Sequence, residues 1–178
     1  MTAQAQAQAP RPRRAVLALG SNLGDRRQNL QGAVDRLFAA PGLGFRAVSP
    51  VYETRPVGGP DQPDYLNAVI AVETALPARA ILDRAHRVED ALRRAREVRW
   101  GPRTLDVDLI VVGDEISDDP ELTLPHPRAY ERAFVLAPWH DIEPDAEIPG
   151  RGRVADLLGA AGLDGVRRAA GSELQPPA

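Results

Sequence analysis

The order in which apolar patterns follow one another constrains the fold of this chain more than any other feature. Apolar runs and alternations that are typical of β-strands lie at residues 14–20, 45–52, 65–73 and 104–112. Apolar residues at helical spacing predict helices at residues 25–40 and 77–92. The resulting order, β-α-β-β-α-β, predicts an α+β fold in which a ferredoxin-like antiparallel sheet is backed by helices, with further elements added at the C-terminal side.

Proline and glycine residues mark the ends of these segments. Pro41 and Gly42 stop the first predicted helix, and Pro77 opens the second at a first helical position. Three prolines and two glycines between Thr54 and Asp64 predict a long loop. Beyond Gly113 the pattern is weaker, and it predicts the last three elements: a helix near residues 128–133, a short strand at 134–136 and a helix at 154–161.

The 178 residues suit one domain, which we expect to span residues 14–165. The start, MTAQAQAQAPRPRR, has low complexity, so residues 1–13 are expected to be a disordered tail. Residues 166–178 end in GSELQPPA, which has no apolar pattern, and are expected to be a second loose tail. The chain has no cysteine, and the apolar run at 15–19 is too short for a membrane span, so we expect a cytoplasmic protein.

The basic residues exclude several kinds of chemistry. All 22 Lys+Arg residues are arginine, which excludes a Walker A loop, a protein-kinase lysine and Schiff-base catalysis. Biased genomic composition would explain the loss of lysine, but the exclusions hold regardless. The net charge of -3 argues against nucleic acid as a partner.

Two carboxylates stand at the start of the last predicted core strand. Asp106 and Asp108 are two positions apart, so their side chains project from one face of the strand, roughly 7 Å apart. Carboxylates so close beside a core raise one another's pKa unless a cation neutralises both, and Mg²⁺ suits such a pair. The alternative is a pair of solvated acids at a strand end.

Arginines and a tryptophan precede this pair. Five arginines fall within eleven positions: Arg93, Arg94, Arg96, Arg99 and Arg103. Guanidinium groups suit phosphate oxygens, whereas a solvated helix end is the alternative explanation. Trp100 in a polar turn suggests a stacking surface for a flat heterocycle, unless it packs into the core.

Two other segments carry candidate residues. The junction from Gly20 to Asp25 lies between a strand and a helix, and its spacing favours helix capping over a dinucleotide fingerprint. His126, between Pro125 and Pro127, is held in an extended loop and could reach a phosphate together with Arg132. No two histidines have the spacing of a zinc site.

Five segments in order resemble the signatures of the 6-hydroxymethyl-7,8-dihydropterin pyrophosphokinase family of folate biosynthesis. They are GSNLGD (20–25), YETRPVG (52–58), DQPDYLNAV (61–69), RWGPRTLDVDLI (99–110) and LPHPRAYERAFVLAPW (124–139). The resemblance implies a ferredoxin-like fold. It also implies that ATP gives its terminal pyrophosphate to the pterin hydroxymethyl group and leaves as AMP.

The resemblance also assigns roles to particular residues. Asp106 and Asp108 would bind two Mg²⁺ ions and, with Arg94 and Arg103, form the catalytic set. The ATP site would contain Glu89, Arg94, Arg96, Arg103, Leu109, His126 and Arg132. The pterin would lie between two aromatic residues in a slot formed by Thr54, Val57, Tyr65, Asn67, Trp100 and Phe134.

One position departs from the family pattern. Many relatives have Gly-Arg-x-Arg before the tryptophan, and Arg93 stands here in place of the glycine. Choosing Arg94 over Arg93 for the leading phosphate contact therefore depends on where a gap is placed.

Two other functions stay open at this point. Paired aspartates on a ferredoxin-like sheet also suit a Mg²⁺-dependent nucleotidyl transferase or cyclase, which would release pyrophosphate. A similar sheet can bind RNA, but that function needs exposed aromatic residues and a basic face, which this acidic chain does not offer. We expect a monomer that acts on ATP and the pterin and binds neither nucleic acid nor membrane.

Overall fold

Strand β1 (Arg13–Ser21) is the axis of the fold, because it pairs along both edges with strands from distant parts of the sequence. The computed structural model describes residues 10–56, 61–93 and 104–178. These residues form a six-stranded sheet in which every strand pair is antiparallel. Its spatial order is β10 (Val166–Arg168), β3 (Tyr52–Thr54), β4 (Tyr65–Thr74), β1 and β5 (Asp106–Val112), and β2 (Gly44–Val48) also pairs with β4.

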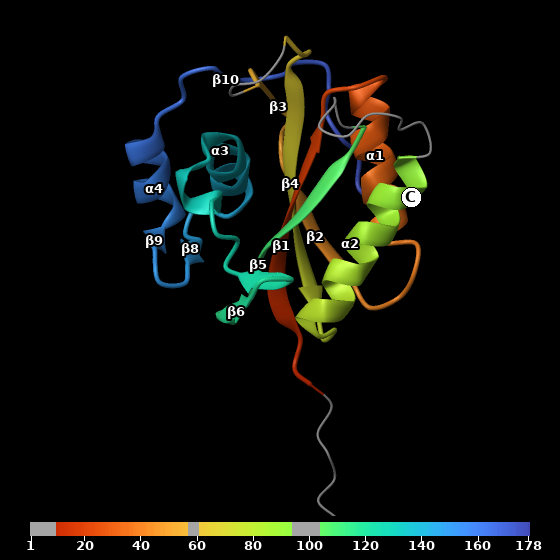
Figure 1. Cartoon of the computed structure of the whole chain (residues 1–178), viewed down its shortest axis with the longest axis vertical. Helices are drawn as coiled ribbons and strands as arrows, with labels where there is room; N and C mark the ends of the chain where they lie inside the picture. The colour runs from red at the N-terminus through yellow and green to blue at the C-terminus, as the bar shows by residue number, and fades with distance from the viewer. Residues whose placement is uncertain (1–9, 57–60, 94–103) are drawn as a thin grey trace, which may run out of the picture.

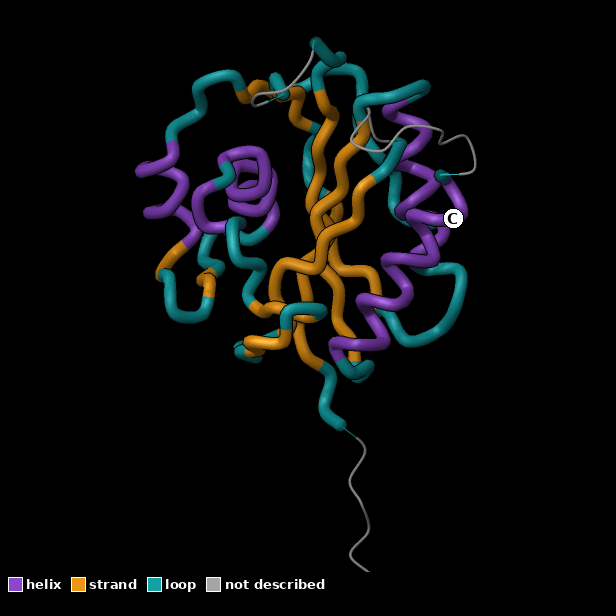
Figure 2. The backbone as a smooth tube through the Cα atoms, in the orientation of Figure 1, coloured by secondary structure: helices purple, strands orange, loops and turns teal. Residues whose placement is uncertain are grey.

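Helices cover both faces of the sheet (Figures 1 and 2). One face carries α1 (Arg26–Leu37) and α2 (Ala78–Leu92), and the other carries α3 (Ala133–Ile142) and α4 (Val154–Ala161). The chain adds two small hairpins and a short 3-10 helix: β6 (Ser117–Asp119) with β7 (Leu122–Leu124), β8 (Glu147–Ile148) with β9 (Gly152–Arg153), and η1 (Ala129–Glu131). The described part of the chain contains no helix that is long and apolar enough to cross a bilayer.

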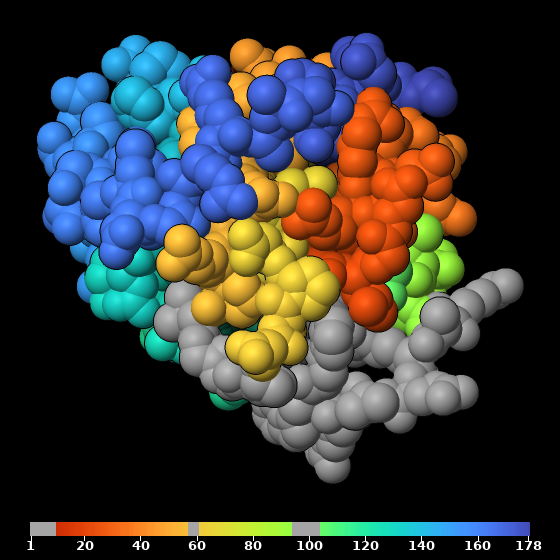
Figure 3. Space-filling model, turned by 90° about the horizontal axis from the view of Figure 1, so that it is seen from above, coloured from red at the N-terminus to blue at the C-terminus, as the bar shows by residue number. Residues whose placement is uncertain are grey.

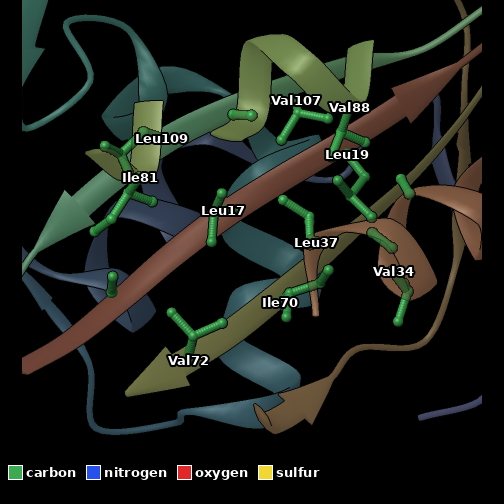
Figure 4. Packing of buried hydrophobic residues seen from close by; sticks show 14 of the residues in the cluster. Leu17, Leu19, Val34, Leu37, Ile70, Val72, Ile81, Val88, Val107 and Leu109 are labelled. Atoms are coloured by element: carbon green, nitrogen blue, oxygen red, sulfur yellow. The ribbon is translucent and has the colours of Figure 1, made fainter. Parts of the chain in front are cut away.

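The alternation of side chains along β1 divides the core into two clusters. Leu17 and Leu19 enter the cluster under α1 and α2, which Figure 4 shows together with Ile70 of β4. Val16 points to the opposite cluster, where the fully buried Trp139 of α3 packs. Both faces of a central strand are thus apolar, which explains why residues 15–19 form a continuous hydrophobic run.

The predicted β-α-β-β-α-β order is confirmed except that one predicted strand is divided in two, and the ends of the other elements shift slightly. Asp25 caps α1, since its Oδ1 accepts a hydrogen bond from the Gln28 backbone N at 3.1 Å. Pro77, predicted as the first helical residue, is instead the N-cap of α2, which begins one position later at Ala78. The capping role favoured for the Gly20–Asp25 junction therefore belongs to Asp25.

The single strand predicted at residues 45–52 is wrong, because the chain forms β2 and β3 with a break between them. Ser49 Oγ accepts a hydrogen bond from the Val69 backbone N at 2.8 Å. Its neighbour Pro50 has no backbone N–H to donate to a ladder. The serine side chain and the proline interrupt the strand, and pairing with β4 resumes in β3 at Tyr52.

The short strand predicted at 134–136 is also wrong. These residues belong to α3, whose apolar run extends to Trp139 and leaves no polar face to reveal the helical period. The helix predicted near 128–133 is reduced to η1, and the helix predicted at 154–161 is α4.

Both predicted tails differ from the structure at their inner ends. Arg13 already belongs to β1 and pairs with Thr74, whereas residues 1–9 lie outside the described ranges. At the other end, residues from 166 onward were expected to be loose, yet β10 pairs with β3 and Leu174 is 7% exposed within the α1–α2 core cluster. A polar strand at a sheet edge has no apolar pattern by which to predict it.

Docking of this C-terminal segment predicts a stability difference between two leucines. Replacing Leu174 by Ala should lower the free energy of unfolding by about 2 kcal/mol, since it removes buried methyl groups and leaves a cavity. Leu163→Ala is the matched control, because Leu163 is 54% exposed and should change stability by less than about 0.5 kcal/mol. Urea unfolding of both variants measures this, and equal effects would contradict the docking.

Candidate active site

At one end of the sheet, candidate site residues on neighbouring strands lie opposite one another and project from the same face of the sheet. Gly20 of β1 pairs with Asn67 on one side and with Asp106 on the other. Tyr52 of β3 pairs in turn with Asn67. Because directly paired residues of an antiparallel sheet point to the same side, these side chains lie on one face, the one covered by α3. Asp108 pairs with Ala18, two positions along β5 from Asp106, and its side chain therefore projects from the same face.

Gly20 lies in the middle of this row of paired residues, and the sequence alone did not predict its structural role. A Cβ built at Gly20 would lie 3.1 Å from Asn67 Oδ1, closer than most side-chain contacts. The glycine therefore leaves room for the Asn67 amide between the two neighbouring strands.

The two carboxylates lie at the start of β5, where an arginine and a buried glutamate meet them. Arg93 Nη2 lies 3.7 Å from Asp106 Oδ1, and the same nitrogen donates a hydrogen bond to Glu89 Oε2. Glu89 Oε1 accepts a hydrogen bond at 3.1 Å from the backbone N of Val107, the residue between the two aspartates. The end of α2 is thereby tied to the strand residues that present Asp106 and Asp108.

Glu89 is 8% exposed, and its environment acts on its charge in two directions. Burial raises the pKa of Glu89 most, and nearby Asp106 and Asp108 raise it further. The Val107 N–H and the Arg93 guanidinium lower it, because both stabilise the carboxylate. The site thus concentrates negative charge, only part of which Arg93 offsets.

His126 lies beside these acids, along the edge of β5 that faces away from β1. Its backbone N donates to Ile110 O at 2.8 Å, and its Nδ1 accepts a hydrogen bond from the Arg128 backbone N at 3.1 Å. An accepting Nδ1 assigns the ring proton of the neutral imidazole to Nε2. Burial lowers the pKa of His126 most, Asp108 opposes this shift, and Arg132 and Arg128 add to it.

A cavity of about 220 Å³ opens between α2, β5 and the segment around β7. Its lining contains four predicted site residues: Glu89, Asp108, Leu109 and His126. It also contains His86, which was not among the predicted site residues. Three residues predicted for the nucleotide therefore surround one cavity that opens beside a carboxylate predicted for the metal.

Three of the predicted pterin residues, Thr54, Tyr65 and Asn67, lie together on the other side of β1. Asn67 Nδ2 donates to Thr54 Oγ1 at 2.8 Å, and both side chains are buried. Tyr65 is the direct partner of Thr54 across β3 and β4. Phe134 lies in the first turn of α3, with the Arg132 guanidinium carbon 5.6 Å from the centre of its ring.

Several predicted residues lie outside the described ranges. They are Val57, Arg94, Arg96, Arg99, Trp100 and Arg103. Their phosphate and stacking roles stay predictions, as does the choice of Arg94 over Arg93. Among the residues that the structure does describe, no three His, Asp or Glu side chains cluster closely enough to hold a metal by themselves.

Sequence reasoning missed two polar contacts that shape this end of the sheet. Asn22, 1% exposed, donates to Gln62 Oε1 at 3.0 Å, which ties the β1–α1 junction to the chain before β4. Arg93 links Glu89 to Asp106. The four-residue spacing between Glu89 and Arg93 at the end of a predicted helix was the sequence feature that could have predicted their ion pair.

An antiparallel ferredoxin-like sheet that carries paired carboxylates between a cavity and a buried polar pair defines an α+β enzyme with a two-part site. Comparison with known proteins identifies the family. Residues 16–144 match the model of 7,8-dihydro-6-hydroxymethylpterin-pyrophosphokinase (HPPK). The chain belongs to this pyrophosphokinase family, and the resemblance inferred from the five segments is confirmed.

Curated relatives agree with the family assignment. A Pseudomonas aeruginosa 2-amino-4-hydroxy-6-hydroxymethyldihydropteridine pyrophosphokinase is 40% identical over 159 residues, which cover 89% of this chain and 98% of the relative. A Mycobacterium leprae protein of the same name is 48% identical over 151 residues, 79% of this chain and 77% of its own length.

Solved structures share the fold. The crystal structure of wild-type Plasmodium falciparum HPPK-DHPS with pterin and p-hydroxybenzoate matches with a TM-score of 0.64 and 14% sequence identity over 86% of this chain. A variant of the same protein gives a TM-score of 0.69. The chain spans less than half of those longer chains, 42% and 48% respectively.

The lowered pKa of His126 predicts a pH dependence of stability in the absence of ligands. The unfolded chain takes up a proton near the ordinary value of 6.5, whereas the folded chain resists protonation to lower pH. The stability contribution is therefore present above pH 6.5 and is lost as the pH falls through the lowered value. In His126→Gln the loss of unfolding free energy between about pH 7 and 5 should be smaller.

Glutamine at residue 126 keeps an acceptor for the Arg128 amide, so the change is mainly in the titrating group. The control is His86→Gln at an exposed position of α2. Urea unfolding at several pH values measures the slopes, and equal flattening in both variants would contradict the effect of His126.

Proposed function

We propose that this enzyme transfers the terminal pyrophosphoryl group of ATP to the hydroxymethyl oxygen of 6-hydroxymethyl-7,8-dihydropterin, releases AMP, and so serves folate biosynthesis. One observation carries the proposal: Asp106 and Asp108 lie between the cavity lined by Glu89 and His126 and the buried Asn67–Thr54 pair. A charged phosphate chain and a flat polar heterocycle would thus meet at the carboxylates.

The donor set at β5 fits Mg²⁺ bound together with a nucleotide. Asp106 is 25% exposed at its side chain and shares a face with Asp108, so two carboxylates can offer oxygens to a hard cation. Glu89 is occupied by Val107 N and Arg93. With two carboxylates, most of the octahedral positions of Mg²⁺ are left for water and phosphate oxygens, which is its usual arrangement in nucleotide sites. When bound, Mg²⁺ would neutralise phosphate charge.

The chemistry balances without a covalent enzyme intermediate. The pterin hydroxyl oxygen forms a bond to the β-phosphorus of ATP, the bond from that phosphorus to the α–β bridging oxygen breaks, and the hydroxyl proton passes to water. AMP leaves with the bridging oxygen. Such a transfer needs mainly alignment of the two substrates and stabilisation of charge on the phosphates.

The residues of the chain divide that work between the two substrates. The Asn67 amide and Thr54 hydroxyl offer donors and acceptors to the edge of the pterin, and Phe134 offers one aromatic face. His126 Nε2–H and the Arg132 guanidinium offer donors to phosphate oxygens. Arg94, Arg96 and Arg103 are proposed to bind further phosphate oxygens, Trp100 the second pterin face and Val57 the slot wall.

Product analysis tests the reaction directly. Protein, Mg²⁺, ATP and 6-hydroxymethyl-7,8-dihydropterin are mixed, and the nucleotides are separated by chromatography. We expect AMP to appear only when the pterin is present. ADP would indicate transfer of a single phosphoryl group, and free pyrophosphate would indicate the alternative, a nucleotidyl transferase. A folded protein that gives no turnover would contradict the proposal.

Substitution of the carboxylates tests the proposed metal site. Asp106→Asn and Asp108→Asn should each lower kcat/KM at least about 100-fold, because charge stabilisation at the transferring group is lost. Both variants should keep the wild-type circular dichroism spectrum and unfolding midpoint to within a few degrees. The matched control is Asp118→Asn on the exposed β6, which should keep full activity. Unfolding of the site variants would favour a structural role instead.

A further inference from the structure

Strand β10 holds the outer edge of the sheet with two arginines that point to opposite faces. Arg167 pairs with Glu53 and Arg168 pairs with Tyr52 in the β10–β3 ladder. We propose that β10 is a positioning element for the pterin side of the site, acting through Arg167 and Arg168. This inference rests on the proposed function, because it concerns how Thr54, Tyr65 and Asn67 are held to receive the pterin.

On the face covered by α1, Arg167 and Arg26 bracket the entry to β4. Glu53 accepts hydrogen bonds from both guanidinium groups, from Arg26 at 2.9 Å. Arg26 Nη1 also donates to the Asp64 carbonyl at 2.8 Å, and Arg167 Nη2 lies 3.4 Å from Asp64 Oδ2. The two anchored positions, Glu53 and Asp64, directly precede the opposed residues of the predicted pterin slot.

Those opposed residues are Thr54 and Tyr65, which form the last pair of the β3–β4 ladder. A last pair has no further ladder bonds beyond it to fix the spacing of its strands. The ion pairs to Glu53 and Asp64 supply that constraint from outside the slot. Arg167 thus controls where the Thr54 hydroxyl meets the Asn67 amide without occupying the slot itself.

On the opposite face, Arg168 joins β10 to α3. Its Nη2 donates to Asp141 Oδ1 at 3.0 Å, and its Nε donates to the Tyr52 hydroxyl at 3.3 Å. The Tyr52 hydroxyl donates in turn to Asp141 Oδ2. This cluster fixes α3, which carries Phe134, relative to the strand that carries Thr54. Both walls of the predicted slot therefore have polar contacts with β10.

The segment after β10 keeps this strand in place. Arg27 of α1 donates to the Glu173 carbonyl through two nitrogens, at 3.1 and 2.9 Å. The Gln31 side chain both donates to Gln175 O and accepts from Gln175 N. Figure 3 shows the blue C-terminal segment lying across residues of β3 and α1 at this end of the molecule. The segment lies beyond residues 16–144, where the family model matches.

Steady-state kinetics of Arg167→Ala and Arg168→Ala test the proposal, with both substrates varied. Each should raise KM for the pterin about five-fold, as expected for loss of partly exposed ion pairs. KM for ATP and kcat should change less than about two-fold, since the cavity lies at the far edge of the sheet. Arg167→Lys keeps the charge and should recover part of the pterin affinity.

The control is Arg153→Ala. Arg153 belongs to the distant β8–β9 hairpin and forms an ion pair with Asp145, which precedes that hairpin. It should leave both KM values unchanged. A pterin KM at the wild-type value in Arg167→Ala and Arg168→Ala, or an equal rise in both KM values, would overturn the proposal.

A second readout does not depend on activity. Amide hydrogen exchange in the peptide covering residues 61–67 should be faster in Arg167→Ala than in wild-type protein and unchanged in Arg153→Ala. Unchanged exchange in Arg167→Ala would overturn the positioning role even in an active enzyme. Wild-type protein that is folded but shows no pterin-dependent turnover would instead contradict the proposed function.

Discussion

The pairing of β1 with β4 and β5 at once is the constraint on which the rest of the structure depends. This double register sets Gly20 between Asn67 and Asp106, and so places an amide and a carboxylate from distant parts of the sequence in one row. Register in a sheet with two apolar faces is strongly specified, because a slip of one residue would exchange the sets of side chains that face the two core clusters. The same burial that stabilises the sheet therefore fixes the spacing of the site residues.

Sequence patterns predicted the elements whose burial is long and regular. Strand β1 has a continuous apolar run, whereas strand β4 and helix α2 have regular apolar periods, and the existence and order of these three elements followed from those patterns. Prediction failed where local chemistry overrides the period. Ser49 and Pro50 interrupt a strand, and α3 is apolar over most of its length, so its pattern does not separate a helix from a strand. Strand β10 is a polar edge strand, and ion pairs that span the chain hold it in place.

Some residues of the candidate site could likewise be predicted from the sequence, and others could not. Residue type and spacing predicted Asp106, Asp108 and His126, because carboxylates two apart at a strand start and a histidine between prolines are visible in the sequence. Residues that position other site residues could not be recognised in this way. Glu89 was assigned to ATP by resemblance, and the structure adds that it holds the Val107 backbone and Arg93. Gly20 makes room for an amide that comes from another strand. Apart from the four-residue spacing of Glu89 and Arg93, such roles depend on tertiary neighbours that no local pattern encodes.

The proposed binding of a cation and phosphates at this site depends on its distribution of charge. Glu89, Asp106 and Asp108 interact closely enough that the two aspartates raise the pKa of Glu89, although Arg93 and a backbone N–H oppose them. A cation bound at the two aspartates would relieve this repulsion, and because the sequence contains no lysine, arginine supplies the fixed positive charge of the side chains. Arginine remains charged at every physiological pH, so it supplies fixed positive charge but no titrating group. Burial and the neighbouring Arg132 and Arg128 lower the pKa of His126 although Asp108 opposes them, so its imidazole stays neutral to lower pH than a solvated histidine.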